Sequence, residues 1–292
     1  MSDVVKPKRG GPRSTVDWSE TQPYQRITVT KVSPAIGALI GGVQLADVDD
    51  ETLTEIRRAL NENCAIFFRD QHMTPEQHIA FGRRFGELDV HPAAANSAGF
   101  EEILVISADE NSNRANGEAW HSDVSCEPQP PMGSILYMKE IPPVGGDTLF
   151  ANMYAAYDAL SDRMKEYLHG LVAVHDGNHV YKGLYAGVAD KPTYPTAKHP
   201  IVRTHPETGR PCLFVNRSFT THIVGLPKDE SDAILNYLYN HIEHPNFQTR
   251  FVWEANSVAF WDNRSAQHRA IWDYWPHRRY GHRVTVKGDT PF

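Results

Sequence analysis

Residues 249–263 read TRFVWEANSVAFWDN, two short runs rich in aromatic and β-branched residues that are separated by an Asn. Short runs of this composition, bounded by turn residues, predict β-strands. Comparable runs follow one another from about residue 101 to the C-terminus, including MGSILYMKE (132–140), DTLFAN (147–152) and HRVTVKG (282–288). A chain built from many short strands predicts a sandwich or barrel. We therefore expect a mostly β fold with a double-stranded β-helix core, the cupin-like jelly roll.

Helices are expected to flank this β core. Apolar residues recur at helical spacing in three segments, and a fourth has Thr74 and Pro75 as start signals and Gly86 as an end signal. Asn152 is expected to cap another. The predicted helices cover residues 49–64, 74–86, 152–171 and 228–245, and predicted strands at 24–32 and 65–70 precede the first two.

Composition limits the class of protein and its partners. Residues 1–22 are polar and rich in Gly and Pro, so we expect a disordered tail, followed by one domain over residues 23–292. The net charge of -7 and the pI near 6.1 argue against nucleic acid and anionic membranes as partners, and favour a small molecule. Three widely separated cysteines predict neither disulfides nor a thiolate metal site. The sequence contains no apolar signal core or membrane-spanning run, so we expect a cytoplasmic protein.

One short motif, AWHSDVS (119–125), suggests a metal site. In a strand, side chains two apart share a face, so His121 and Asp123 can direct a nitrogen and a carboxylate oxygen at one point. His268, far downstream beside a predicted strand, can supply a third ligand. Two histidines and one carboxylate leave three positions open, the arrangement of non-haem Fe(II) oxygenases. The alternative is a chance pair, since the chain has 15 histidines and short motifs are weak evidence alone.

Two arginines strengthen the metal hypothesis. Arg279 and Arg283 are four residues apart, so in a strand both guanidinium groups lie on one face, with Gly281 between them leaving room for a ligand. Two inward arginines repel each other and are costly to bury unless each meets an anion. The pair therefore predicts two anionic ligands. An exposed arginine pair is the alternative.

The motifs together resemble the taurine dioxygenase family of Fe(II)/2-oxoglutarate-dependent oxygenases, over about residues 27–292. By this resemblance His121, Asp123 and His268 are the iron ligands, while Thr148 and Arg279 hold the distal carboxylate of 2-oxoglutarate. Fe(II), 2-oxoglutarate and O2 are the implied cofactor and co-substrates, with succinate and CO2 released as a substrate is hydroxylated. The motifs that carry the resemblance include WHSD (120–123), GGDTLFANMYAAYDALS (145–161), WDNRSAQHRA (261–270) and HRRYGHRVTVKGDTPF (277–292).

The resemblance also assigns substrate contacts. It implies that His91 and Arg283 meet an anionic head group and that Val124 and Phe219 form apolar walls beside the reacting carbon. A planar guanidinium is well matched to sulfonate, sulfate or carboxylate oxygens. The family further implies a homo-oligomer.

Three departures from the taurine enzyme bear on the substrate. Ala94 stands where that enzyme has a tyrosine, Gly177 where it has a phenylalanine, and Gly117 where it has an asparagine. Each change is from large to small, which predicts a wider pocket and a bulkier substrate: a larger sulfonate, an alkyl sulfate, or an aryl or aryloxy carboxylate, with taurine a poor one. The competing view is that Tyr181 or Tyr185 refills the space.

Two other classes of protein stay open. A different cupin-like metalloenzyme would use the same ligands without needing Thr148 and Arg279. A non-catalytic anion-binding barrel would keep the arginines and have no need of the metal triad. Asp262 and Asn263 are expected only to order the turn before His268.

Overall fold

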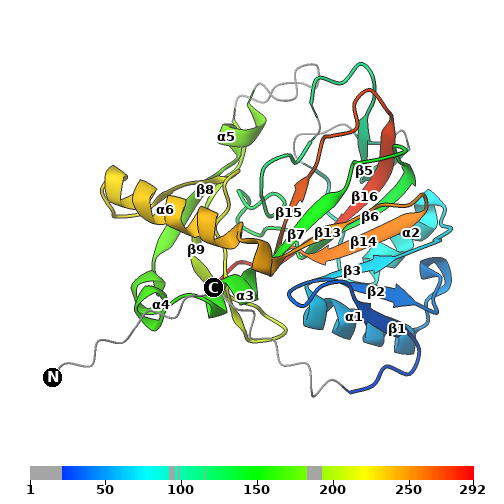
Figure 1. Ribbon diagram of the computed structural model, residues 1–292, viewed down its shortest axis with the longest axis horizontal. Coiled ribbons are helices and arrows are strands. Elements are labelled where there is room, and N and C mark those ends of the chain that lie inside the picture. Colours follow the sequence, from blue (N-terminus) through cyan, green and yellow to red (C-terminus); the bar gives the residue numbers. More distant parts are fainter. Residues whose placement is uncertain (1–21, 92–95, 98, 115, 183–192) are drawn as a thin grey trace.

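The computed structural model describes residues 22–91, 96–97, 99–114, 116–182 and 193–292, so the predicted tail lies outside the described residues except for Gln22. Its largest element is an eight-stranded sheet (Figure 1). All neighbouring strands in it are antiparallel except β2 and β3. In spatial order its strands are β1 (Thr28–Lys31), β2 (Ala38–Gly41), β3 (Ala65–Phe68), β14 (Ser257–Asp262), β6 (Gly133–Glu140), β16 (Arg279–Val286), β5 (Phe100–Ala108) and β4 (Asn96–Ser97).

Strand β14 lies in the middle of this sheet, and all six of its residues are buried. It pairs with β3 through Phe260 and Ile66 and with β6 through Phe260 and Ile135. The second run of TRFVWEANSVAFWDN is therefore apolar without alternation because both faces of the strand are covered. Its first run forms β13 (Gln248–Phe251), which belongs to a different sheet.

That second sheet faces the large one and has three antiparallel strands. Its order is β13, β7 (Thr148–Asn152) and β15 (Ala266–Ala270). A single bridge extends it, because His121 and His268 exchange backbone hydrogen bonds of 3.1 and 2.9 Å. A third sheet contains β12 (Thr220–Ile223), β8 (Val172–Asp176) and β9 (Thr196–Pro200), and a two-stranded ribbon joins β10 (Val202–Thr204) to β11 (Pro211–Leu213).

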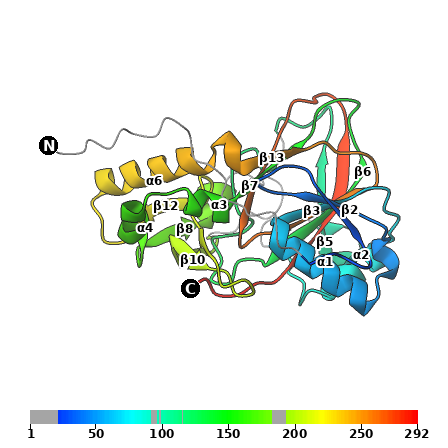
Figure 2. The same cartoon turned by 60° about the horizontal axis from the view of Figure 1, so that its bottom comes forward.

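Helices cover the outer faces of the sheets. Figures 1 and 2 place α1 (Asp50–Asn63) and α2 (Pro75–Arg83) beside β1–β3, and α6 (Lys228–Ile242) on the opposite side of the molecule near β8 and β12. Thr74 and Gln77 form a capping box on α2, as its start signal predicts, although α2 ends at Arg83 rather than near Gly86. Shorter helical segments include α5 (Gly177–Tyr181), η1 (Leu45–Asp47) and η2 (Pro245–Phe247).

One helix prediction is wrong. The segment 152–171 forms two short helices, α3 (Met153–Asp158) and α4 (Asp162–Leu168), instead of one. The helix is interrupted before Ser161, whose side chain accepts the Met164 N–H and so caps the start of a new helix. Asn152 caps α3 by accepting the Ala155 N–H, as predicted.

Two clusters of buried side chains hold these layers together. One packs α1 and α2 against the large sheet and includes Ile56, Leu60 and Phe68, while the other fills the space between the facing sheets around Phe150 and Trp261. This mostly β architecture with flanking helices confirms the predicted jelly-roll core, and over the described residues the facing sheets do not close into a continuous barrel. Among the described residues, no helix is both long and apolar enough to cross a bilayer.

Candidate active site

A cavity of about 290 Å³ lies between the large sheet and the β13–β7–β15 sheet. Strands of both sheets line it, together with the segments that precede β6 and β12. All nine site residues singled out from the sequence line this cavity: His91, His121, Asp123, Val124, Thr148, Phe219, His268, Arg279 and Arg283.

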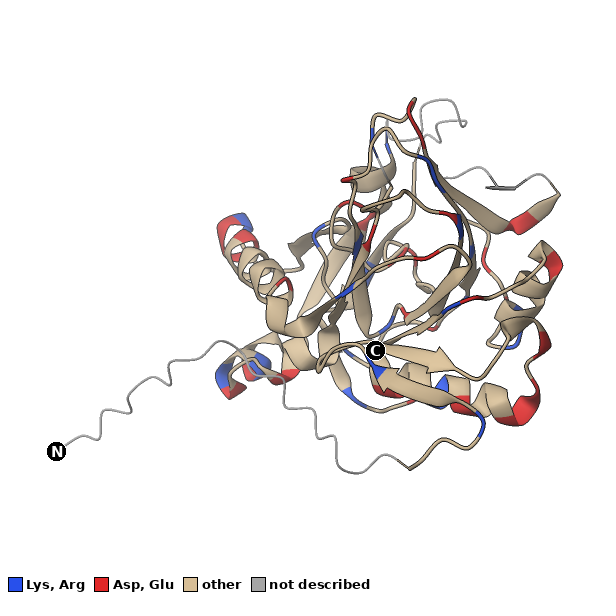
Figure 3. Ribbon diagram, turned by 45° about the vertical axis from the view of Figure 1, so that its right-hand side comes forward, with Lys and Arg blue, Asp and Glu red and all other residues tan. Residues whose placement is uncertain are grey.

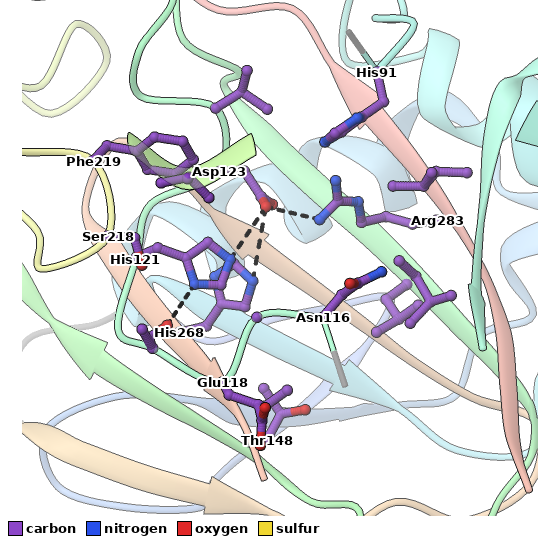
Figure 4. Close-up of a pocket in the computed structure, with 18 of the residues that line it drawn as sticks. His91, Asn116, Glu118, His121, Asp123, Thr148, Ser218, Phe219, His268 and Arg283 are labelled. Atoms are coloured by element: carbon purple, nitrogen blue, oxygen red, sulfur yellow. Dashed lines mark hydrogen bonds and ion pairs between the residues drawn. The ribbon is translucent and has the colours of Figure 1, made fainter. Parts of the chain in front are cut away.

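His121, Asp123 and His268 bring one ligand atom each to a common point (Figure 4). These atoms lie within 4.8 Å of one another. The Nε2 atoms of His121 and His268 are 3.6 and 3.9 Å from Oδ1 of Asp123. Within the described part of the chain this is the one such group of three His, Cys, Asp or Glu residues.

The three residues converge for a different reason than predicted. His121 makes only an isolated bridge, and Asp123 lies in a turn, so the expectation that strand alternation aligns the pair is wrong. The residue after the aspartate, Val124, has a φ of 45°, a left-handed conformation that β-branched residues rarely adopt. The turn, rather than a strand face, directs the carboxylate toward the histidines.

Asp123 is buried and ionised. It is 3% exposed, and its Oδ1 accepts a hydrogen bond from Arg283 Nη1 at 2.7 Å while Oδ2 accepts one from Ser134 at 2.7 Å. Burial opposes ionisation, but Arg283 and the nearby histidines outweigh it and hold the pKa of Asp123 well below its usual range. Burial and the neighbouring His121 lower the pKa of His268 well below its usual value. At neutral pH the site therefore presents a carboxylate and a neutral His268.

These donors fit a divalent metal ion. His121 Nδ1 lies 2.8 Å from the Ala119 carbonyl, which fixes the N–H at Nδ1 and leaves the Nε2 lone pair directed toward the other ligands. His268 Nδ1 is buried and has no hydrogen-bond partner among the described residues, so its Nε2 is the nitrogen that faces Asp123. Two imidazole nitrogens and one carboxylate oxygen form the facial set typical of non-haem iron.

On one side of the triad, Thr148 and Arg279 form a polar corner. Trp253 connects them, because its Nε1 donates to Thr148 Oγ1 at 3.0 Å and its ring lies 5.5 Å from the Arg279 guanidinium carbon. Arg279 Nε donates to the Gly146 carbonyl at 3.0 Å, a bond that involves neither terminal amino group. A hydroxyl that accepts one bond can still donate another, so this corner can present several donors to a carboxylate.

On the other side, Arg283 lies between the triad and His91 (Figure 4). The His91 ring packs edge-on against Tyr181 at 5.7 Å, and Tyr181 in turn contacts Phe219 at 5.6 Å. With Val124, these aromatic residues form an apolar wall, so this half of the cavity combines the guanidinium of Arg283 with apolar surface.

Several lining residues were not found from the sequence. Arg114, Asn116, Glu118 and Ser218 also line the cavity. The first three precede the ligand histidine in the polar segment NSNRANGEAW, which carries no periodicity that could have indicated which side chains face inward.

The predictions that Gly177 and Gly281 leave open space are wrong. A Cβ at Gly177 would lie 2.8 Å from the Pro195 carbonyl and 3.0 Å from Cys126 Sγ, so neighbouring atoms already fill that space and it does not widen the cavity. A Cβ at Gly281 would meet the Tyr137 carbonyl at 2.7 Å, so this glycine admits strand β6 rather than a ligand. Gly117 does line the cavity, with its Cβ position 3.1 Å from the His121 ring. Ala94 and Tyr185 lie outside the described residues.

A jelly roll that carries two histidines and a carboxylate on one wall, with a cationic corner on either side, defines the class: a non-haem iron oxygenase. The family model described as "Taurine catabolism dioxygenase TauD, TfdA family" matches residues 28–285, and the chain belongs to this family of 2-oxoglutarate-dependent dioxygenases. Fe(II), 2-oxoglutarate and O2 are the cofactor and co-substrates of this class.

Individual relatives agree with this placement. A putative alpha-ketoglutarate-dependent sulfonate dioxygenase of Schizosaccharomyces pombe is 38% identical over 90% of this chain and 71% of its own length. An alkylsulfatase of Acinetobacter baylyi is 33% identical over 91% of this chain and 87% of its own. The crystal structure of a taurine dioxygenase from Burkholderia xenovorans superimposes with a TM-score of 0.81 at 39% identity, covering 91% of each chain.

Proposed function

We propose that residues 23–292 form one dioxygenase domain that hydroxylates a small anionic organic molecule. The substrate is a sulfonate, an alkyl sulfate, or an aryl or aryloxy carboxylate that is bulkier than taurine. The observation that carries this proposal is the placement of two buried arginines of β16, Arg279 and Arg283, in one cavity with a triad of metal-binding donors between them. Each arginine can bind a separate anion, one from the co-substrate and one from the substrate.

Each side chain then has a defined task. His121, Asp123 and His268 hold Fe(II), and Thr148 with Arg279 binds the distal carboxylate of 2-oxoglutarate. When bound, the iron supplies the oxidation, in which 2-oxoglutarate and O2 give succinate, CO2 and a hydroxylated substrate. The protein positions both organic molecules and excludes water, since the ligand side chains are 12% exposed or less.

Arg283 and His91 bind the substrate anion, while Val124 and Phe219 contact its carbon skeleton. Arg283 is paired with Asp123, so an anion that binds there must share or take over this guanidinium. Relatives named for sulfonates and alkyl sulfates support an anionic substrate. Neighbouring atoms fill the space beside Gly177. Of the three large-to-small positions, Gly117 is therefore the one described position that supports a substrate bulkier than taurine.

Acidic and basic residues are interspersed along the helices in Figure 3, which supports a small-molecule substrate over nucleic acid or a membrane surface. We propose a cytoplasmic homo-oligomer, in keeping with the family.

Succinate release tests the function. The purified protein is supplied with Fe(II), 2-oxoglutarate and O2, alone and with taurine, longer alkyl sulfonates, alkyl sulfates and aryloxyacetates. We expect substrate-stimulated succinate formation that is lost in Asp123→Ala, with a longer or aromatic anion preferred over taurine.

The other outcomes distinguish the alternatives. Metal-dependent turnover without 2-oxoglutarate would indicate another cupin-like metalloenzyme. Anion binding with no turnover, unchanged in Asp123→Ala, would indicate a binding protein. Efficient turnover of taurine would refute the bulkier-substrate proposal alone.

A further inference from the structure

The side chain of Asn263, which lies in the turn between β14 and β15, forms hydrogen bonds with the backbone of Asp123. Its Oδ1 accepts the Asp123 N–H at 2.6 Å, and its Nδ2 donates to the Asp123 carbonyl at 2.9 Å and to the Pro131 carbonyl at 3.1 Å. Asn263 is 1% exposed and does not line the cavity. Both backbone groups of Asp123 are thus bound to one side-chain amide, much as a neighbouring strand would bind them.

A second buried cluster holds Ser125, two residues further along. Its hydroxyl lies 2.9 Å from His175 Nδ1 and accepts a hydrogen bond from Asn216 Nδ2 at 2.9 Å. Its carbonyl oxygen lies 2.9 Å from His199 Nε2. All four residues are 1% exposed or less, so water cannot replace these bonds without opening the core.

Val124 lies between these two anchors in a conformation that it would not adopt alone. Its φ of 45° brings the β-branched side chain into steric conflict with the backbone, while the side chain is 2% exposed and lines the cavity. Strain of this kind persists only where the surrounding structure imposes it. Residues on each side of Val124 are fixed by buried hydrogen bonds, which supply that constraint.

We infer that Asn263 is a positioning residue that holds Asp123 in its metal-binding orientation against the strain at Val124. The inference rests on the proposed function, because it assumes that Asp123 binds the metal. Without the amide, the backbone at residues 123–124 can relax toward ordinary negative φ values. The carboxylate then turns away from His121 and His268, and the side chain of Val124 leaves the substrate wall.

Metal affinity tests this role independently of activity. Mn(II) binding to the full-length protein is measured by calorimetry for wild type, Asn263→Ala and Asn152→Ala. Asn152 is a matched control, since its buried amide also accepts a backbone N–H and donates to a backbone carbonyl, at Ala155 and Ala35, but lies outside the site. We expect Mn(II) affinity to fall about 10- to 100-fold in Asn263→Ala and to stay near wild type in Asn152→Ala.

Relief of the strain should reverse the defect. Glycine adopts positive φ without penalty, so adding Val124→Gly to Asn263→Ala should restore Mn(II) affinity by about tenfold. If the alanine variant does not fold, Asn263→Asp keeps the acceptor and loses both donated bonds, and the same loss and rescue are expected.

Three results would overturn the inference: wild-type Mn(II) affinity in Asn263→Ala, an equal loss in Asn152→Ala, or no recovery on adding Val124→Gly. Failure of the proposed function is distinguishable, because wild type would then bind no Mn(II), or would bind it unchanged in Asp123→Ala.

Discussion

Arg283→Gln is expected to destabilise the metal-free protein much more than the metal-loaded one. Arg283 Nη1 lies 2.7 Å from Asp123 Oδ1, and the two side chains are only 9% and 4% exposed. Removing one partner of a buried ion pair leaves the other charge without compensation, which costs about 3–5 kcal/mol. A bound divalent cation would replace the lost positive charge beside Asp123. The penalty should therefore shrink by at least half when metal is present.

The measurement is the free energy of unfolding from urea denaturation, followed by far-UV circular dichroism in EDTA and again in saturating Mn(II). Arg217→Gln is the matched control: its ion pair with Glu243 is also 2.7 Å long, but the side chains are 40% and 25% exposed. The control should lose about 1 kcal/mol or less in both conditions. A loss from Arg283→Gln that is the same with and without Mn(II), or no larger than the control's, would refute the reasoning.

Three further outcomes are expected. Arg279→Lys should weaken 2-oxoglutarate binding about 10- to 100-fold, because the planar fork is lost while the charge stays; an unchanged dissociation constant in a 2-oxoglutarate titration would contradict it. Burial lowers the pKa of His78 and of His175 to about 3, so between pH 6.5 and 3 only the unfolded chain takes up these protons. The free energy of unfolding should then fall as pH drops, by about 1.4 kcal/mol per unit for each histidine, and constant stability from pH 7 to 5 in denaturant titrations would be inconsistent with this. Gly177→Phe should lower the melting temperature, since its Cβ already meets the Pro195 carbonyl at 2.8 Å; a stable variant with improved taurine turnover would restore the wider-pocket argument.

The fold could be predicted because strand composition is a local property. The composition of runs such as SVAFWDN and MGSILYMKE predicts buried strands, and these runs form β14 and β6. Local signals also placed the caps at Thr74 and Asn152. The break at Ser161 could not be predicted because apolar residues continue at helical spacing across it. The second helix is marked only by the hydrogen bond from the Met164 N–H to the Ser161 side chain, which leaves that spacing unchanged.

The candidate site was less accessible from the sequence. His121 and Asp123 could be paired by spacing, but the turn that aims them depends on Asn263, which is far away in the chain. From the sequence alone, Asn263 is expected only to order its own turn. Likewise, whether a glycine opens space depends on its neighbours in three dimensions. The space beside Gly177 is filled by atoms of residues far away in the chain, whereas Gly117 faces the cavity. The sequence around the two glycines does not distinguish these cases.

The backbone bridge between His121 and His268 has a consequence for the lifetime of the chain. It joins segments that meet only when β15 has paired with β7 and the jelly roll is complete, so an unfolded chain offers no assembled site. A metal ion that binds only the folded form stabilises it by mass action, by about 1.4 kcal/mol for each tenfold excess of free metal over the dissociation constant. Proteases attack opened chains, so a metal ion bound at this site would lengthen the life of each molecule as well as enable its reaction.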